Sequence, residues 1–172
     1  AGYLGAYRLL ISDLLVLTMA EEPMAPPGRV EELVRRVREV RPDLPVIPAV
    51  FRPRPVGEVR GMKVAYVSTA PPAVLKRLAG HLEEGYGCEV VAVSGNLSNR
   101  SKLAEDLEGM PGVDAYLTEI KAAAVDVVTR RGAEEGRRVI YCDNDPVAEG
   151  LDDALLHLAR AAGRGRSGDR GV

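Results

Sequence analysis

Short apolar segments alternate with helical patterns along nearly the whole chain, and this alternation constrains its fold more than any other feature. The apolar segments are rich in β-branched residues and nearly continuous, as expected for strands covered on both faces. They lie at residues 14–19, 46–51, 63–68, 89–94, 113–118 and 138–142. Helical patterns follow them at 28–40, 72–84, 98–109, 121–132 and 151–162. This order predicts an α/β protein with βαβ units and a three-layer, mostly parallel sheet.

A stretch that contains Pro53, Pro55 and Gly57 predicts a domain boundary near Gly61, because these residues resist regular structure. Residues 1–61 contain only two predicted strands, which cannot bury both faces alone, so they are predicted to be the tail of a larger domain. Residues 62–162 contain four strands with crossover helices and are predicted to form a small α/β domain. Residues 163–172 are rich in Gly and Arg and are predicted to form a disordered tail.

The charge balance and the apolar runs exclude several classes of protein. The chain has 23 basic and 25 acidic residues and a formal net charge of −2, so no nucleic-acid partner is expected and any anion site must be local. The longest apolar run, at residues 14–20, is too short to cross a bilayer, so no membrane partner and a cytoplasmic location are expected. Cys88 and Cys142 are predicted to be buried free thiols, and neither His81 nor His157 is predicted to be catalytic.

Polar residues follow each strand of the second block, where ligands collect in parallel sheets because loops and helix N-termini converge there. The segment SGNLSNRSK, residues 94–102, is the most suggestive. Gly95 would permit a tight turn, Ser98 would cap the next helix, and Arg100 and Lys102 would lie in its first turn. This pattern predicts an anion site with Arg100 as its cation. Hydrogen bonds to the anion are predicted from Ser94, Gly95, Asn96 and Asn99. The alternative is an ordinary βα turn with solvated Arg and Lys side chains.

Three further strand ends contribute candidate residues. Thr69 follows the strand at 63–68 and is a predicted substrate contact. Lys121 opens a helix after the next strand end and is a second predicted cation, the alternative being a surface ion pair with Glu119 or Glu134. Asp143 and Asp145 follow the last strand as further predicted substrate contacts. Helix capping by Asp145 or an Asx turn is the alternative for this pair.

The first block carries a second group of candidates. Thr18, Glu21 and Glu22 follow its opening strand, and Arg52 and Arg54 follow its second strand. An acidic pair at a strand end can hold magnesium or orient a water molecule in phosphoryl transfer, so Glu21 and Glu22 are the predicted metal ligands. Thr18, Arg52 and Arg54 are the predicted nucleotide-binding residues.

Several segments together resemble the C-terminal part of the cyclic 2,3-diphosphoglycerate synthetase family, roughly over residues 2–150. The segments are GYLGAYRLLISDLLVLTMAEEPMA (2–25), KVAYVSTAPP (63–72), YGCEVVAVSGNLSNRSKLAEDL (86–107), DAYLTEIKAAAVDVVTRRGAEEG (114–136) and VIYCDNDP (139–146). The resemblance implies a P-loop protein that uses ATP and Mg²⁺ to close 2,3-bisphosphoglycerate into an internal phosphoanhydride. One group would be phosphorylated so that another can displace the new phosphate.

The resemblance also implies where the rest of the machinery lies. No GxxxxGK[ST] motif occurs in the sequence, so the P-loop region is expected to be absent and the chain to be a fragment that is inactive alone. Residues 1–61 would then be the C-terminal segment of a P-loop nucleotide-binding core. Its loop at 52–57 would lie near the nucleotide base. Arg100 and Lys121 would be the catalytic residues, because their positive charges let one phosphate approach another.

Two other functions remain open from the sequence. The block from residue 62 onward could be a non-catalytic anion-binding or dimerisation module, which keeps a homodimer open as a partner. A related P-loop GTPase is the other alternative. An Asn-Lys-x-Asp motif for reading a guanine base is absent from the sequence, which lowers the standing of that alternative.

Overall fold

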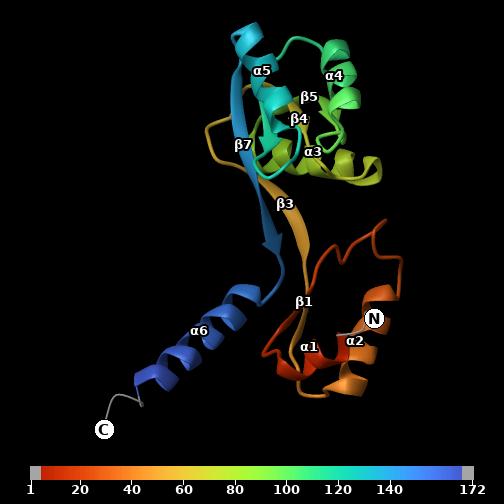
Figure 1. The fold of residues 1–172 in the computed structure, drawn as a ribbon, viewed down its shortest axis with the longest axis vertical. Coiled ribbons are helices and arrows are strands. Elements are labelled where there is room, and N and C mark those ends of the chain that lie inside the picture. The colour runs from red at the N-terminus through yellow and green to blue at the C-terminus, as the bar shows by residue number, and fades with distance from the viewer. Residues whose placement is uncertain (1–4, 168–172) are drawn as a thin grey trace. The chain divides into compact units, whose positions relative to one another are not determined.

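A computed structural model describes residues 5–167, with side chains described through Gly163 (Figure 1). The described chain forms two compact units. One contains the residues up to Phe51 together with those from Pro146 onward, and the other contains Arg52–Asp145. None of the helices within the described residues has the length and apolarity that crossing a bilayer requires.

The first unit contains helices α1 (Gly5–Ile11), α2 (Arg29–Val40) and α6 (Leu151–Ser167) and the short strands β1 (Leu15–Leu17) and β2 (Val46–Pro48). β1 and β2 are parallel, with Leu15 opposite Val46. The Arg41 guanidinium, just after α2, donates hydrogen bonds to the carbonyl oxygens of Leu10 (2.9 Å) and Ser12 (2.5 Å). These bonds tie the end of α1 to the end of α2.

The second unit is built on a five-stranded sheet of order β3-β7-β6-β4-β5. Its strands are β3 (Val50–Pro55), β4 (Lys63–Val67), β5 (Glu89–Ser94), β6 (Ala115–Glu119) and β7 (Arg138–Val147). β4 pairs in parallel with β5 and β6, and β6 pairs in parallel with β7. β3 runs opposite to β7 (Figure 1), and the Val56 N–H donates to the Tyr141 carbonyl oxygen at 2.8 Å.

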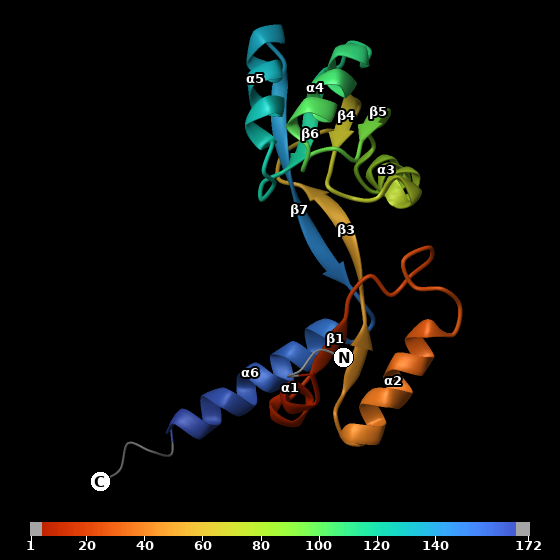
Figure 2. The same ribbon diagram turned by 45° about the vertical axis from the view of Figure 1, so that its right-hand side comes forward.

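Helices cover both faces of this sheet (Figure 2). Helix α3 (Pro72–Tyr86) places Leu78 and Leu82 against one face, beside Tyr66 and Leu117. Helices α4 (Arg100–Gly109) and α5 (Val125–Glu135) cover the other face, in a second apolar cluster. The near-continuous apolar strands are explained by this arrangement, because both faces of the central strands are buried. The predicted three-layer, mostly parallel α/β fold is confirmed.

The region around the expected boundary differs from the prediction. Pro53 and Pro55 lie within β3, because β3 is an edge strand and a proline there removes no hydrogen bond that a neighbouring strand needs. The compact units divide after Phe51, so the boundary expected near Gly61 falls inside the second unit. Residues 163–167 of the expected tail are helical in α6, and residues 168–172 lie outside the described part.

Candidate functional site

The strand order places a topological switch point between β4 and β6. The chain leaves β4 towards α3 on one face of the sheet and leaves β6 towards α5 on the other. Loops that diverge in this way open a crevice at the carboxyl ends of the two strands, which is where open α/β sheets bind ligands. Topology therefore favours a site at the ends of these two strands. Ser68 and Thr69 follow β4, and residues 119–121 lie at the end of β6.

Glu119, the last residue of β6, spans this switch point. Its Oε1 accepts a hydrogen bond from Ser68 Oγ at 2.5 Å and a longer one from the Thr69 N–H at 3.4 Å, and its Oε2 accepts from Thr69 Oγ1 at 2.9 Å. Ser68 is fully buried, whereas Thr69 is exposed. Three donors from one loop thus converge on one carboxylate. Sequence reasoning considered Glu119 only as a partner for Lys121 and missed this role.

Tyr66, on β4, lies near Ser68 and Glu119. It lies on β4 two residues before Ser68, which directly follows the strand, so both side chains lie on the same face of the sheet. Burial is the main cause that raises the pKa of Tyr66, while the nearby Ser68 hydroxyl lowers this pKa and the charge of Glu119 raises it. The Tyr66 hydroxyl is fully buried and has no hydrogen-bond partner within the described residues. A buried hydroxyl without a partner is unusual, since such groups normally cost about 1–3 kcal/mol.

A cavity of about 270 Å³ opens beside Glu119, between the end of β6 and residues 142–145 within β7. It is lined by Glu119, Ile120, Lys121, Cys142, Asp143, Asn144 and Asp145. Lys121 is exposed and makes no ion pair within the described part of the chain. The predicted alternative of a Lys121 ion pair with Glu119 or Glu134 is therefore not seen.

Arg100, the first residue of α4, extends to the loop that carries Lys121. Its guanidinium donates to Asp126 Oδ2 at 2.7 Å and to the Ala123 carbonyl oxygen at 2.8 Å. The hydrogen bond with Asp126 raises the pKa of Arg100 and lowers the pKa of Asp126. The two predicted cations thus meet at the β6–α5 loop, but Arg100 already has an anionic partner that any ligand must displace.

The residues after β5 are mainly bonded to one another. Ser94 Oγ donates to Asp106 Oδ2 at 2.5 Å, and the Asn96 side-chain amide donates to the same oxygen at 2.8 Å. Ser94 is almost completely buried. Asn99, and not Ser98 as predicted, is the N-cap of α4, because its side-chain oxygen accepts from the Lys102 N–H at 3.2 Å.

Gly95 allows two loops of this rim to approach closely. A Cβ atom at Gly95 would lie 2.6 Å from the Ala70 carbonyl oxygen and 3.3 Å from Leu75 Cδ1. Gly95 is not among the glycines with positive φ, so the need for glycine arises from limited space rather than from an unusual turn. The loops after β4 and β5 are held together at this point.

Asp143 and Asp145 lie within β7 and are held by Arg54 on the adjacent strand β3. Arg54 Nε donates to Asp145 Oδ2 at 2.6 Å, and Nη2 donates to Asp143 Oδ2 at 2.9 Å. The alternative of helix capping or an Asx turn at Asp145 is wrong, because β7 continues through Val147 and both carboxylates face a strand arginine. The hydrogen bond with Asp145 raises the pKa of Arg54.

The remaining candidates belong to other segments of the chain. Thr18 is exposed after β1, Glu21 is half-buried and Glu22 is exposed in the segment that follows, and Arg52 lies within β3. No cluster of three or more potential metal ligands was found among the described residues. Glu21 and Glu22 together would supply two carboxylates, which suit Mg²⁺ chemically but do not complete its coordination.

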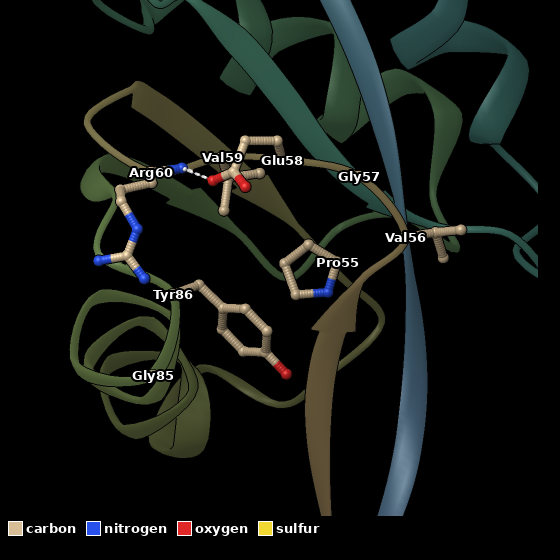
Figure 3. Close-up of a pocket in the computed structure, with 8 residues that line it drawn as sticks. All are labelled: Pro55, Val56, Gly57, Glu58, Val59, Arg60, Gly85 and Tyr86. Carbon is tan, nitrogen blue, oxygen red and sulfur yellow. Dashed lines mark hydrogen bonds between the residues drawn. The ribbon is translucent and has the colours of Figure 1, made fainter.

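Figure 3 shows a second cavity, of about 390 Å³, at the end of β3. The Tyr86 ring lies opposite Pro55, and Arg60 lies beside the end of α3. Its lining includes Pro55, Val56 and Gly57, which belong to the stretch at 52–57 expected near a nucleotide base. Residues 52–55 of that stretch form strand β3 and not a loop.

The predicted thiols are confirmed: Cys88 and Cys142 are buried and free. Burial raises the pKa of Cys142 to about 12. His81 lies within α3, where its ring packs edge-to-face on Tyr86 at 5.9 Å between centroids. Burial is the main cause that lowers the pKa of His81.

Comparisons with known proteins match both units. The family model described as the cyclic 2,3-diphosphoglycerate synthetase C-terminal domain matches residues 55–145, and the model of the P-loop domain of the same synthetase matches residues 1–50. The expectation that the P-loop region is absent is therefore corrected, although no GxxxxGK[ST] motif occurs in the 172 residues.

Individual relatives carry the same description. A cyclic 2,3-diphosphoglycerate synthetase of Rubrobacter xylanophilus is 98% identical over the whole chain, which covers 39% of that relative. Relatives with the same name from Methanothermus fervidus and Thermococcus kodakarensis are 44% and 48% identical, over 94% and 92% of the chain and 36% and 37% of their own lengths. The chain thus spans less than half the length of these relatives.

Proposed function

Because the chain belongs to the cyclic 2,3-diphosphoglycerate synthetase family, we propose that it acts as part of an ATP-dependent ligase that converts 2,3-bisphosphoglycerate into cyclic 2,3-diphosphoglycerate. The observation that carries this proposal is the joint match of a P-loop domain over residues 1–50 and of the synthetase C-terminal domain over residues 55–145. Together the two matches cover most of the chain.

The proposed reaction is a phosphoryl transfer followed by ring closure. The γ-phosphoryl group of ATP passes to an oxygen of one substrate phosphate, which releases ADP. An oxygen of the other substrate phosphate then attacks the inner phosphorus, closes the phosphoanhydride and displaces inorganic phosphate. Both steps bring anionic groups together, so positive charge near the substrate should accelerate them.

The second unit is proposed to hold the substrate at the rim between β4, β5 and β6. Lys121 has no ion pair within the described residues and is the best-placed cation. Arg100, at the start of α4, reaches the loop that carries Lys121 and would exchange Asp126 for a substrate phosphate. Thr69 is exposed at the switch point and can donate to an anion. Gly95 would keep the neighbouring loop close.

The other rim residues are proposed to contribute less directly. Ser94 and Asn96 are bonded to Asp106, and Asn99 caps α4, so they would shape the rim. Asp143 and Asp145 are negatively charged and would repel a phosphate unless Arg54 or a bound cation neutralises their charge.

The nucleotide contacts and the Mg²⁺ ligands stay proposals that come from the sequence. Thr18, Arg52 and Arg54 remain the proposed nucleotide contacts, and Glu21 and Glu22 the proposed Mg²⁺ ligands. Magnesium would neutralise charge on the transferred phosphate when bound. The cytoplasmic location and a homodimer stay predictions.

The test uses the complete synthetase, with turnover of ATP and 2,3-bisphosphoglycerate as the readout. Arg100→Ala and Lys121→Ala should each reduce kcat by about a hundredfold, because each removes a charge that stabilises the transition state. Lys76→Ala, which removes an exposed positive charge from α3, should change little. Unchanged turnover in the first two variants would remove these residues from the proposal.

A non-catalytic second unit is the alternative, favoured by the acidic lining of the cavity at Glu119, Asp143 and Asp145. Calorimetry of 2,3-bisphosphoglycerate with the 172-residue chain separates the two functions. A binding heat that decreases with added salt supports substrate binding. Absence of any such heat supports a module that does not bind the substrate.

A further inference from the structure

The Glu119 carboxylate occupies a position that would suit an anionic ligand. Its two oxygens accept from the Ser68 hydroxyl, the Thr69 hydroxyl and, at greater distance, the Thr69 N–H. Hydroxyl and backbone N–H donors that converge at the end of a strand are the groups that bind phosphoryl or carboxyl oxygens. The carboxylate therefore uses donors that an incoming anion would need.

A fourth donor near this position lacks a partner. The Tyr66 hydroxyl is fully buried and makes no hydrogen bond within the described residues. Tyr66 and Glu119 lie on the same face of the sheet, because Tyr66 pairs with Leu117 and Glu119 follows Leu117 by two residues. A ligand oxygen that entered beside Ser68 would provide the acceptor that this hydroxyl lacks. Glu119 alone leaves the hydroxyl unsatisfied.

The neighbouring cavity offers Glu119 an alternative position. Glu119 and Lys121 both line the cavity of about 270 Å³, and Lys121 makes no ion pair within the described part of the chain. A carboxylate released from Thr69 could turn into this space, where the positive charge of Lys121 would stabilise it. Asp143 and Asp145 also line the cavity, but both are already paired with Arg54. Thr69 is exposed, so an anion can reach its donors from solvent.

We propose that Glu119 is a resident anion: its carboxylate fills a phosphoryl or carboxyl site made by Ser68, Thr69 and Tyr66 and leaves this site towards Lys121 when a ligand binds. The proposal rests on the proposed function only for its natural ligand, a phosphorylated acid. The exchange itself requires no nucleotide and should occur in the 172-residue chain.

The experiment measures binding of inorganic phosphate to the ¹⁵N-labelled chain by NMR. In the wild type, phosphate should shift the Thr69 amide resonance, together with the Glu119 side-chain carboxyl resonance in a ¹³C-labelled sample. Glu119→Gln keeps the size of the side chain but removes its charge, so it should bind phosphate about tenfold more tightly. Thr69→Val should weaken the binding by about tenfold, because it removes the exposed hydroxyl donor and leaves the others in place.

Glu108→Gln is the matched control, since it removes one exposed carboxylate from α4 in the same unit. It should leave phosphate affinity unchanged within twofold. Equal affinities in the wild type and Glu119→Gln, or a Thr69 amide that does not respond to phosphate, would overturn the proposal. If Glu119→Gln fails to fold, the wild-type titration decides, because a structural brace would keep the Glu119 resonance unmoved.

Titration with 2,3-bisphosphoglycerate distinguishes this proposal from the synthetase proposal. If phosphate displaces Glu119 but 2,3-bisphosphoglycerate binds no more tightly than phosphate, the resident anion stands and the substrate assignment fails. If 2,3-bisphosphoglycerate binds tightly without moving Thr69 or Glu119, the substrate assignment stands and the resident anion is wrong.

Discussion

A methyl group added at Gly95 should destabilise the second unit. In Gly95→Ala, the new Cβ would lie 2.6 Å from the Ala70 carbonyl oxygen and 3.3 Å from Leu75 Cδ1. Unstrained carbon–oxygen contacts begin at about 3.3 Å, so the loops after β4 and β5 must separate by roughly 0.7 Å. The obstacle at Ala70 is backbone and cannot rotate away. Overpacking of this kind costs about 1–3 kcal/mol, a substantial part of the roughly 5–15 kcal/mol that stabilises a typical domain.

Native-state hydrogen exchange of the β4 amides is the appropriate assay, because the chain has two compact units and β4 belongs only to the second. The control is Gly80→Ala within α3, where a Cβ would meet nothing within 4 Å. It should raise the free energy of unfolding by about 0.5–1 kcal/mol, since alanine favours the helix over glycine. The reasoning would be refuted if the two substitutions changed the stability of β4 in the same direction.

Three further predictions concern charge and ionisation. Asp126→Asn should increase affinity for 2,3-bisphosphoglycerate in calorimetry, because it releases Arg100 from its carboxylate partner; weaker binding would contradict this. Arg54→Ala should lower the urea midpoint at low salt more than at high salt, because it leaves the exposed carboxylates of Asp143 and Asp145 unpaired. An equal decrease of the midpoint at both salt concentrations would argue against an electrostatic role. Burial raises the pKa of Cys142 from 9.0 to about 12, so the unfolded thiol ionises first and the free energy of unfolding should fall as pH rises through this range. Cys142→Ala should flatten that alkaline fall in urea titrations, although Tyr66, whose pKa is also raised, will contribute part of it.

The periodicity of the sequence was sufficient to predict the layers of the second unit. The apolar strands at 63–68, 89–94, 113–118 and 138–142 correspond to β4, β5, β6 and the first half of β7. Such runs report burial on both faces, which is a local property of the sequence. Pro53 and Pro55 misled the prediction because proline disfavours interior strands but is tolerated at an edge, and edge position is a property of the whole sheet.

The rim of the sheet was likewise predictable as a location but not as a set of contacts. Parallel strands must end at one edge, so the positions of Thr69 and Lys121 near that edge followed from the predicted βαβ alternation alone. The sequence did not reveal which of these polar side chains are already hydrogen-bonded to other residues of the chain. Arg100 was predicted as the cation of an anion site, and its bond with Asp126 joins residues 26 positions apart.

The fold class, the rim where polar strand ends collect and the resemblance to a synthetase family could therefore be read from the amino-acid order. The bonds of Glu119 to Ser68 and Thr69, and of Arg54 to Asp143 and Asp145, became visible only in the folded molecule. These partners are separated by 50 or 51 and by 89 or 91 positions. Local propensity acts over a few residues, whereas a hydrogen bond between distant side chains depends on strand order and register, which no short stretch of sequence encodes.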